Sequence, residues 1–124
     1  MDAITPEDVT ARPWGGYRTT AFVPGGGCTK ILIVHPGMRL SLQRHARREE
    51  HWVVLKGEVT VQVSGDQMAG KSGSYFYVPR GAWHRLGNAG AEEALVAETQ
   101  VGAYSSPEEA EEDIERSSDD FGRA

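Results

Sequence analysis

The sequence lacks the features that mark several large classes of protein. Cys28 is the only cysteine among 124 residues, which excludes an intramolecular disulfide and a metal site built from several thiolates. No apolar run approaches the roughly 18 residues of a membrane-spanning helix, and no charged-then-apolar leader opens the chain. We therefore expect neither membrane insertion nor classical export, and we expect the protein in the cytoplasm.

An excess of positive charge is also missing, which argues against nucleic acid as a partner. The formal net charge is −5, and residues 101–124 hold eight acidic against two basic side chains. Residues 1–100 hold ten acidic and eleven basic side chains, and four arginines stand close together there: Arg39, Arg44, Arg47 and Arg48. This cluster either attracts an anionic small molecule such as a phosphate, or balances the acidic tail in solvent.

Short β-type runs alternate with turn residues between Thr20 and Gln100. The predicted strands are residues 30–34, 40–43, 51–55, 58–63, 75–78, 84–86 and 94–99. Glycine, proline or asparagine ends most of them, and residues 58–63 alternate strictly between polar and apolar side chains. This pattern predicts one all-β domain, an antiparallel sandwich or barrel over residues 12–104.

The ends of the chain differ from this pattern. Residues 1–11 are expected to form an extended arm. Ser106-Pro107-Glu108-Glu109 is a capping box with proline at the first helical position, so a helix is predicted from there to about Arg116. Residues 105–124 would then form an acidic helix and tail.

Four side chains are candidate metal ligands. Gln43 and His45 lie two residues apart on a predicted strand and therefore share a face. Glu50 begins the next strand after a tight turn, and His84 comes from a separate hairpin. Together they offer the nitrogen and oxygen donors that hold a first-row divalent metal with positions left open for substrate. The alternative is a structural polar cluster.

Glycine, proline and asparagine recur at fixed spacings around these ligands. One segment runs from Gly37 to Gly57 and contains Gln43, His45 and Glu50. The other carries five spaced residues: Gly73, Pro79, Gly81, His84 and Asn88. The two segments resemble the two motifs of the cupin superfamily, except that Gln43 stands where a histidine is usual. The resemblance implies a cupin double-stranded β-helix, or jelly-roll barrel, with a short C-terminal helix.

Gln43 at the usual histidine position, together with the segments around the ligands, resembles one branch of that superfamily. The segments that carry this likeness are Arg12-Pro13-Trp14-Gly15-Gly16-Tyr17, Leu40-Ser41-Leu42-Gln43-Arg44-His45, Glu50-His51-Trp52 and His84-Arg85-Leu86-Gly87-Asn88. They are similar to the C-terminal cupin domain of type II mannose-6-phosphate isomerase, as in the bifunctional mannose-1-phosphate guanylyltransferase/phosphomannose isomerase. Two departures stand out. The family usually has histidines where this chain has Ala46 and Arg47, and residues 105–110 form an insertion.

The resemblance implies a metal on Gln43, His45, Glu50 and His84, with zinc favoured over manganese, iron, cobalt or nickel. It also implies a catalytic role for Arg85, which strict strand alternation would place opposite His84 unless the strand twists or bulges.

The implied reaction moves a proton between C1 and C2 of a sugar phosphate through an enediolate. A metal stabilises the developing charge as a Lewis acid, and a general base is also required. Glu98 shares a strand face with Gln100 and is a candidate base, with a barrel-lining hydrogen-bond partner as its alternative. The side chains of Lys30, Arg39 and Arg80 are candidate phosphate contacts. The alternative interpretation for these three is ordinary surface charge.

Three functions compete. The first is a metal-dependent isomerase that interconverts mannose 6-phosphate and fructose 6-phosphate; the second is a non-catalytic module that binds metal or sugar phosphate. The third is a cupin dioxygenase, which Gln43 disfavours because a neutral amide is a weaker donor for redox iron. A homodimer is also expected, from an outward apolar face formed by Leu40, Leu42, Val53 and Leu55.

Overall fold

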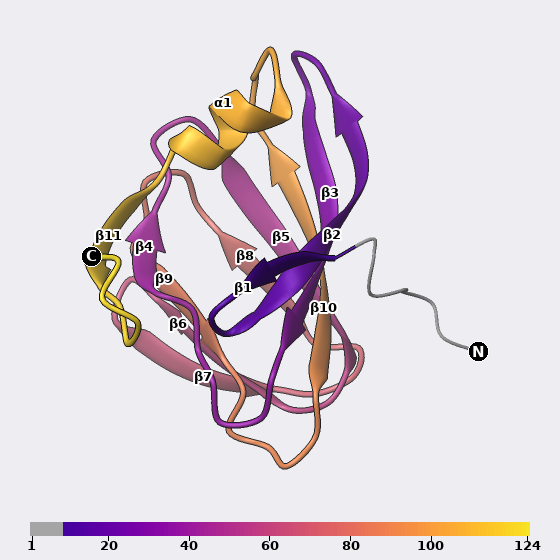
Figure 1. Ribbon diagram of the computed structural model, residues 1–124, viewed down its shortest axis with the longest axis vertical. Helices are drawn as coiled ribbons and strands as arrows, with labels where there is room; N and C mark the ends of the chain where they lie inside the picture. Colours follow the sequence, from indigo (N-terminus) through magenta and orange to yellow (C-terminus); the bar gives the residue numbers. More distant parts are fainter. Residues whose placement is uncertain (1–8) are drawn as a thin grey trace.

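Two antiparallel sheets pack face to face in the computed structural model, which describes residues 9–124 (Figure 1). The first sheet has the order β1 (Thr10–Arg12), β2 (Gly15–Val23), β3 (Gly27–Val34), β10 (Ala94–Val101), β5 (Glu49–Lys56) and β8 (Tyr75–Val78). The second has the order β11 (Glu115–Ser118), β4 (Leu42–Arg44), β9 (His84–Gly87), β6 (Val59–Val63) and β7 (Asp66–Gly70). One short helix, α1 (Pro107–Glu112), is described.

Strand alternation builds an apolar core between the two sheets. On β5 the side chains of Trp52 and Val54 are buried while Val53 is exposed, and on β6 Val61 is buried. These residues join one hydrophobic cluster drawn from both sheets. The apolar run of residues 51–55 predicted β5 and the period of two in residues 58–63 predicted β6, and the structure confirms both strands.

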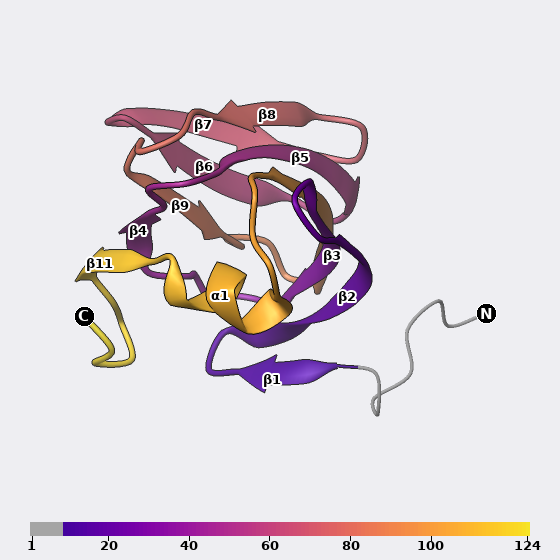
Figure 2. The ribbon, with the colours of Figure 1, turned by 90° about the horizontal axis from the view of Figure 1, so that it is seen from above.

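The inward positions change from apolar to polar along β10. Ala94 and Val96 belong to the hydrophobic cluster, whereas Glu98 and Gln100 are buried polar residues farther along the same face. Figures 1 and 2 show α1 lying across this end of the sandwich, between β4 and the β2–β3 hairpin. The fold thus holds an apolar core at one end and a buried polar site at the other, beneath the helix.

Gly27 lets two strands approach closely at the polar end. Its φ is +148°, and a Cβ there would overlap the carbonyl oxygen of Gln100 on β10. Only glycine fits such a position without moving the neighbouring backbone. The β3–β10 pairing that carries Lys30 and Glu98 therefore depends on it.

The C-terminal helix is shorter than predicted. The Ser106 side chain accepts a hydrogen bond from the backbone N–H of Glu109, as a capping box requires, but α1 ends at Glu112 rather than near Arg116. Asp113 leaves the helical conformation because its carboxylate accepts hydrogen bonds from the backbone N–H groups of Ala46 and Arg47. The residues beyond then pair with β4 as strand β11. Tertiary hydrogen bonds outweigh the local helical preference here.

Further differences concern the ends of the chain, the hairpin after β6 and the face of Leu40. Residues 1–8 of the predicted arm lie outside the described residues, and residues 10–12 form β1. Strand β7 was not predicted, and it pairs with β6 across the turn at Ser64 and Gly65. Leu40 points into the core and is 7% exposed, so it does not belong to an outward apolar face. Residues 39–41 form only an isolated bridge, and Leu40 and Ser41 are both buried, so strict alternation fails there.

Candidate metal centre

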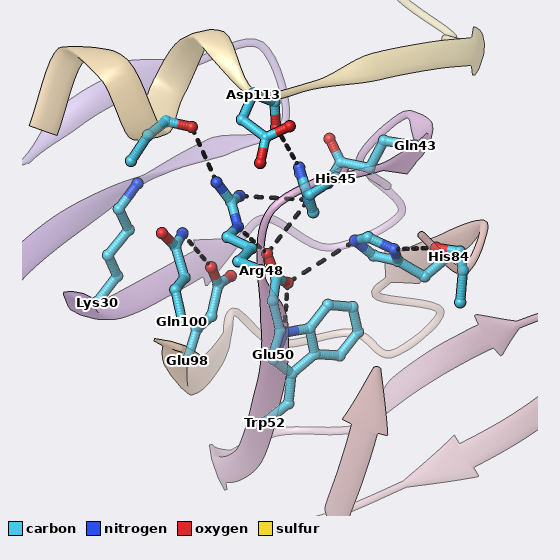
Figure 3. Close-up of polar contacts among 12 residues, drawn as sticks. Lys30, Gln43, His45, Arg48, Glu50, Trp52, His84, Glu98, Gln100 and Asp113 are labelled. Carbon is cyan, nitrogen blue, oxygen red and sulfur yellow. Dashed lines mark hydrogen bonds and ion pairs between the residues drawn. The ribbon is translucent and has the colours of Figure 1, made fainter. Parts of the chain in front are cut away.

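Three buried side chains from different elements converge beneath α1 (Figure 3). They are His45, which follows β4, Glu50 on β5 and His84 on β9, and their ligand atoms all lie within 4.8 Å of one another. His45 Nε2 lies 3.2 Å from Glu50 Oε2, and His84 Nε2 lies 3.7 Å from Glu50 Oε1. The two sheets thus contribute to one His/Glu/His group.

Backbone carbonyls fix the tautomers of both histidines. Nδ1 of His45 lies 2.7 Å from the carbonyl oxygen of Asp113, and Nδ1 of His84 lies 2.9 Å from that of Ala82. A carbonyl oxygen can only accept, so each Nδ1 carries the hydrogen and each Nε2 offers a lone pair. This outer hydrogen bond is the usual way a protein orients a histidine toward a metal.

The protonation states favour binding of a cation. Burial lowers the pKa of His45 to about 4, so its ring is neutral at pH 7. Burial alone would raise the pKa of Glu50, but its interactions with Arg48, His45 and His84 together outweigh burial and lower that pKa to about 2. Nε2 of His84 is buried and has no hydrogen-bond partner within residues 9–124. A buried lone pair facing a carboxylate and a second imidazole nitrogen fits a metal ligand.

Gln43 lies beside this group. Register pairs it with His84 across β4 and β9, and it lines the same cavity as His45 and Glu50 (Figure 3). Its Oε1 atom accepts a hydrogen bond of 3.2 Å from Ser41 Oγ. The structure therefore places three of the four predicted ligands along one cavity, with His84 behind them beside Glu50. The Gln43 side chain is half-buried.

Arg48 enters the centre itself, which the sequence did not indicate. It is 7% exposed, and its Nε donates to Glu50 Oε2 over 2.8 Å while its Nη2 lies 3.2 Å from Nε2 of His45. Its Nη1 donates to the carbonyl oxygen of Ala110 in α1. Burial opposes its charge, but Glu50 and Glu98 outweigh burial and raise the pKa of Arg48. No local pattern distinguishes Arg48 from the exposed Arg47, because only the turn after His45 decides which arginine points inward.

Glu98 and Lys30 line the cavity beside the centre. Burial, and after it the charge of Glu50, raise the pKa of Glu98 to about 7. Gln100 Nε2 donates to Glu98 Oε1 over 2.6 Å, and Lys30 forms an ion pair with Glu111 of α1. The cavity has a volume of about 70 Å³, below the range of roughly 300–1,000 Å³ typical of small-molecule sites.

Three further predicted site residues do not line this cavity. Arg85 points to the other face of β9, where its Nε donates to the carbonyl oxygen of Leu40 over 2.8 Å. Arg39 is half exposed and makes two hydrogen bonds to the carboxylate of Asp120, of 2.7 and 2.8 Å. Arg80 is exposed after β8. Alternation along β9 accounts for Arg85, since the buried His84 takes the inward position.

Sequence comparison connects the chain with a family of carbohydrate enzymes. A family model described as Mannose-6-phosphate isomerase C-terminal matches residues 3–119. A mannose-1-phosphate guanylyltransferase from Sinorhizobium fredii is 41% identical over 93 residues, which cover 75% of this chain and 18% of that protein. The alginate biosynthesis protein AlgA of Pseudomonas aeruginosa is 38% identical over 112 residues, which cover 90% of this chain and 22% of AlgA. The chain thus spans about a fifth of the length of these relatives.

Structural comparison confirms the predicted fold. A conserved protein with a double-stranded β-helix domain from Klebsiella pneumoniae superposes with a TM-score of 0.71 and 16% identity, over 94% of this chain and 98% of that one. At this identity the likeness concerns the fold alone, and it supports the cupin double-stranded β-helix expected from the two motifs. Within residues 9–124, no helix has the length and apolar character needed to cross a bilayer.

Proposed function

Because the chain belongs to the mannose-6-phosphate isomerase C-terminal family, we propose that it interconverts mannose 6-phosphate and fructose 6-phosphate. The observation that carries the proposal is the cluster of two imidazole lone pairs and one ionised carboxylate, with Glu98 in the same cavity. Such a set suits an aldose–ketose isomerisation, which polarises two adjacent oxygens and moves one proton. The relatives are about four times as long as this chain, so the activity is proposed for this chain rather than transferred to it.

Gln43, His45, Glu50 and His84 would hold the metal, with zinc favoured because it accepts both imidazole nitrogen and carboxylate oxygen ligands. When bound, the metal supplies Lewis-acid polarisation of the carbonyl and hydroxyl oxygens of the sugar. The backbone carbonyls that accept from Nδ1 of each histidine hold both rings with Nε2 aimed inward. The protein thus prepares the ligand set before substrate arrives.

Glu98 is suited to carry the proton between C1 and C2. A pKa of about 7 leaves both its charged and its neutral form populated near neutral pH, as a group that takes up and returns one proton requires. Gln100 holds its carboxyl group in place through the 2.6 Å hydrogen bond. Arg48 adds a fixed positive charge in the same cavity, which favours negative charge on the enediolate oxygens. This assigns to Arg48 the electrostatic role first expected of Arg85.

One observation favours a second function, a metal-independent or non-catalytic sugar-phosphate module. Arg48 already donates to Nε2 of His45 and Oε2 of Glu50, the two atoms that a metal would need. A guanidinium in that position satisfies the carboxylate without any metal. The two functions differ in whether the zinc-loaded protein turns over the sugar phosphate.

A coupled assay that follows fructose 6-phosphate formation from mannose 6-phosphate tests the proposal. We expect turnover by the zinc-loaded protein, loss of turnover after EDTA treatment and recovery on adding zinc back. His84→Ala should abolish both turnover and bound zinc, whereas His51→Ala, on the outward side of β5, should retain both. A fully metallated wild type without turnover would refute the isomerase and leave the binding module.

A further inference from the structure

Five cationic side chains line the cavity: Arg12, Lys30, Arg48, Arg116 and Arg123. Three of them are paired with a carboxylate, namely Lys30 with Glu111, Arg48 with Glu50, and Arg123 with Asp119. Arg12 and Arg116 have no carboxylate oxygen within 4.0 Å among residues 9–124. The lining therefore carries two positive charges that no described ion pair neutralises.

Arg116 lies next to the candidate metal centre. It is the register partner of Gln43 across β11 and β4, so the two side chains begin on neighbouring positions of one sheet face. Its Nε atom is buried and has no hydrogen-bond partner in the described part of the chain. Burial, and next the positive charge of Arg123, lower the pKa of Arg116. A buried donor without an acceptor is rare in folded proteins and indicates a missing partner.

Arg12 reaches the same cavity from β1. Its Nη2 lies 3.4 Å from the hydroxyl oxygen of Tyr17, and its guanidinium carbon lies 5.1 Å from the centre of the Tyr17 ring. Lys30 Nζ lies 4.2 Å from the centre of the same ring. The charge of Arg12 also contributes to lowering the pKa of Arg116, so the two guanidinium groups repel each other. An anion held between them would relieve that repulsion.

We propose that Arg12 and Arg116 form an anion subsite beside the candidate metal centre, and that it binds the phosphate group of a sugar phosphate. A phosphate monoester carries a charge of about −1.5 to −2 at pH 7, which matches two unpaired guanidinium groups. The guanidinium fork also matches phosphate oxygens in geometry. The subsite rests on the proposed function, because it takes the sugar end of the same molecule to lie at the metal ligands.

This subsite differs from the phosphate contacts expected from the sequence. Arg39 already makes two hydrogen bonds to Asp120 and Arg80 lies outside the cavity, so neither is available to a ligand inside it. Lys30 does line the cavity, but Glu111 is its partner. The two arginines that remain come from β1 and β11, the first and last strands of the described chain.

Isothermal titration of the zinc-loaded protein with mannose 6-phosphate, and separately with mannose, tests the subsite. Arg12→Gln and Arg116→Gln should each weaken mannose 6-phosphate binding by about ten-fold or more, since each removes a charge-assisted contact. Neither variant should change the affinity for mannose. Arg80→Gln makes the same change in net charge outside the cavity and should bind mannose 6-phosphate like the wild type. Arg116→Lys should recover part of the lost affinity.

The outcomes separate this inference from the isomerase. Wild-type affinity for mannose 6-phosphate in both glutamine variants, with folding verified by circular dichroism, overturns the subsite even if turnover persists. Equal affinity of the wild type for mannose and mannose 6-phosphate overturns it as well. Tighter binding of mannose 6-phosphate than of mannose, weakened in both variants, supports the subsite. If the wild type then shows no turnover, only the isomerase proposal is refuted.

Discussion

The ionisable residues of the candidate centre hold different charges at neutral pH although they share one buried space. Glu50 is ionised, His45 is neutral and Glu98 lies near its midpoint, following pKa values of about 2, 4 and 7. Burial is the main cause for His45 and Glu98, whereas for Glu50 the guanidinium of Arg48, whose Nε donates to it, is the largest cause that opposes burial. A buried carboxylate is stable only when it is paired, so the guanidinium of Arg48 stabilises the ionised form of Glu50.

Arg48→Met should lower the stability of the metal-free protein and strengthen its response to metal. Removal of the guanidinium leaves the charge of Glu50 buried and unpaired, which costs about 3–5 kcal/mol. It also frees Nε2 of His45 and Oε2 of Glu50 for zinc. Thermal unfolding with EDTA and with zinc measures both effects, as a lower apo Tm and a larger zinc-induced rise than in the wild type.

Arg44→Met is the matched control for that variant. Arg44 is half exposed and pairs with Glu115 at the surface, so its loss should change Tm little and leave the zinc response as in the wild type. A zinc response of Arg48→Met no larger than that of Arg44→Met would show that the arginine does not compete for the ligand atoms.

Glu98→Gln should remove a pH dependence of stability from the metal-free protein. The pKa of Glu98 is raised from 4.5 to about 7, so between these pH values the folded state binds this proton more tightly than the unfolded state does. The free energy of unfolding of the wild type, relative to that of the variant, should therefore be highest below about pH 4.5. It should fall by at most about 3 kcal/mol as the pH rises to about 7. Urea unfolding of both proteins at a series of pH values measures the difference. Parallel curves would contradict the shifted pKa.

At the scale of elements, the loop between β4 and β5 and the segment around α1 hold each other in place. Asp113 accepts hydrogen bonds from the backbone N–H groups of Ala46 and Arg47, each 2.9 Å, and from the Tyr104 hydroxyl. Arg47 also pairs with Glu109 at 2.5 Å. The two departures noted in the sequence, at residues 46–47 and 105–110, thus meet in space. The loop between His45 and Arg48 is fixed by a segment more than 60 residues away.

Asp113→Ala should weaken metal binding although Asp113 is not a predicted ligand. Its loss removes the acceptors that hold the loop, and its carbonyl oxygen, which fixes the tautomer of His45, would then move. Changes to such outer partners reduce metal affinity by about 10- to 100-fold. Competition with a chelator measures the affinity, and Glu112→Ala, an exposed neighbour with the same change of charge, should leave it unchanged.

The elements that could be predicted are those in which one local pattern decides the structure. The sequence of β6 alternates between apolar and polar residues, and β5, β8 and β10 contain runs of apolar residues, so their sequences indicate them directly. Strand β7 is exposed over most of its length, so its sequence shows no such alternation. The end of α1 depends on hydrogen bonds from the distant β4–β5 loop, which no local pattern contains.

Some residues of the candidate site could likewise be predicted from the sequence, and others could not. His45, Glu50 and His84 could be placed together because fixed spacings around glycine and proline bring known strands into contact. Arg48 could not, because four arginines within ten residues look alike in sequence and only one turns inward. Arg116 was assigned to a helix, and its position opposite Gln43 follows only from the pairing of β11 with β4.

For the whole molecule, one outer surface is unusually apolar. The face of the first sheet that points away from the core exposes large side chains on β5, β8 and β10, with 38–55% of each accessible: Val53, Leu55, Tyr75, Tyr77 and Val101. Leu40 and Leu42 do not contribute, since Leu40 lies in the core and Leu42 is half-buried on the second sheet. A contiguous apolar patch on a small domain is typical of an interaction surface.

We therefore predict a homodimer formed through the outer face of the first sheet. Light scattering after size exclusion should give about twice the chain mass of 13.5 kDa. Val53→Lys places a charge at the centre of the face and should shift the mass to that of the monomer, because an unpaired buried charge is costly. Met68→Lys is the matched control, since Met68 is equally exposed, at 38%, but lies on β7 of the second sheet. A wild-type monomer, or a Val53→Lys protein that remains dimeric, would place the contact elsewhere or exclude it.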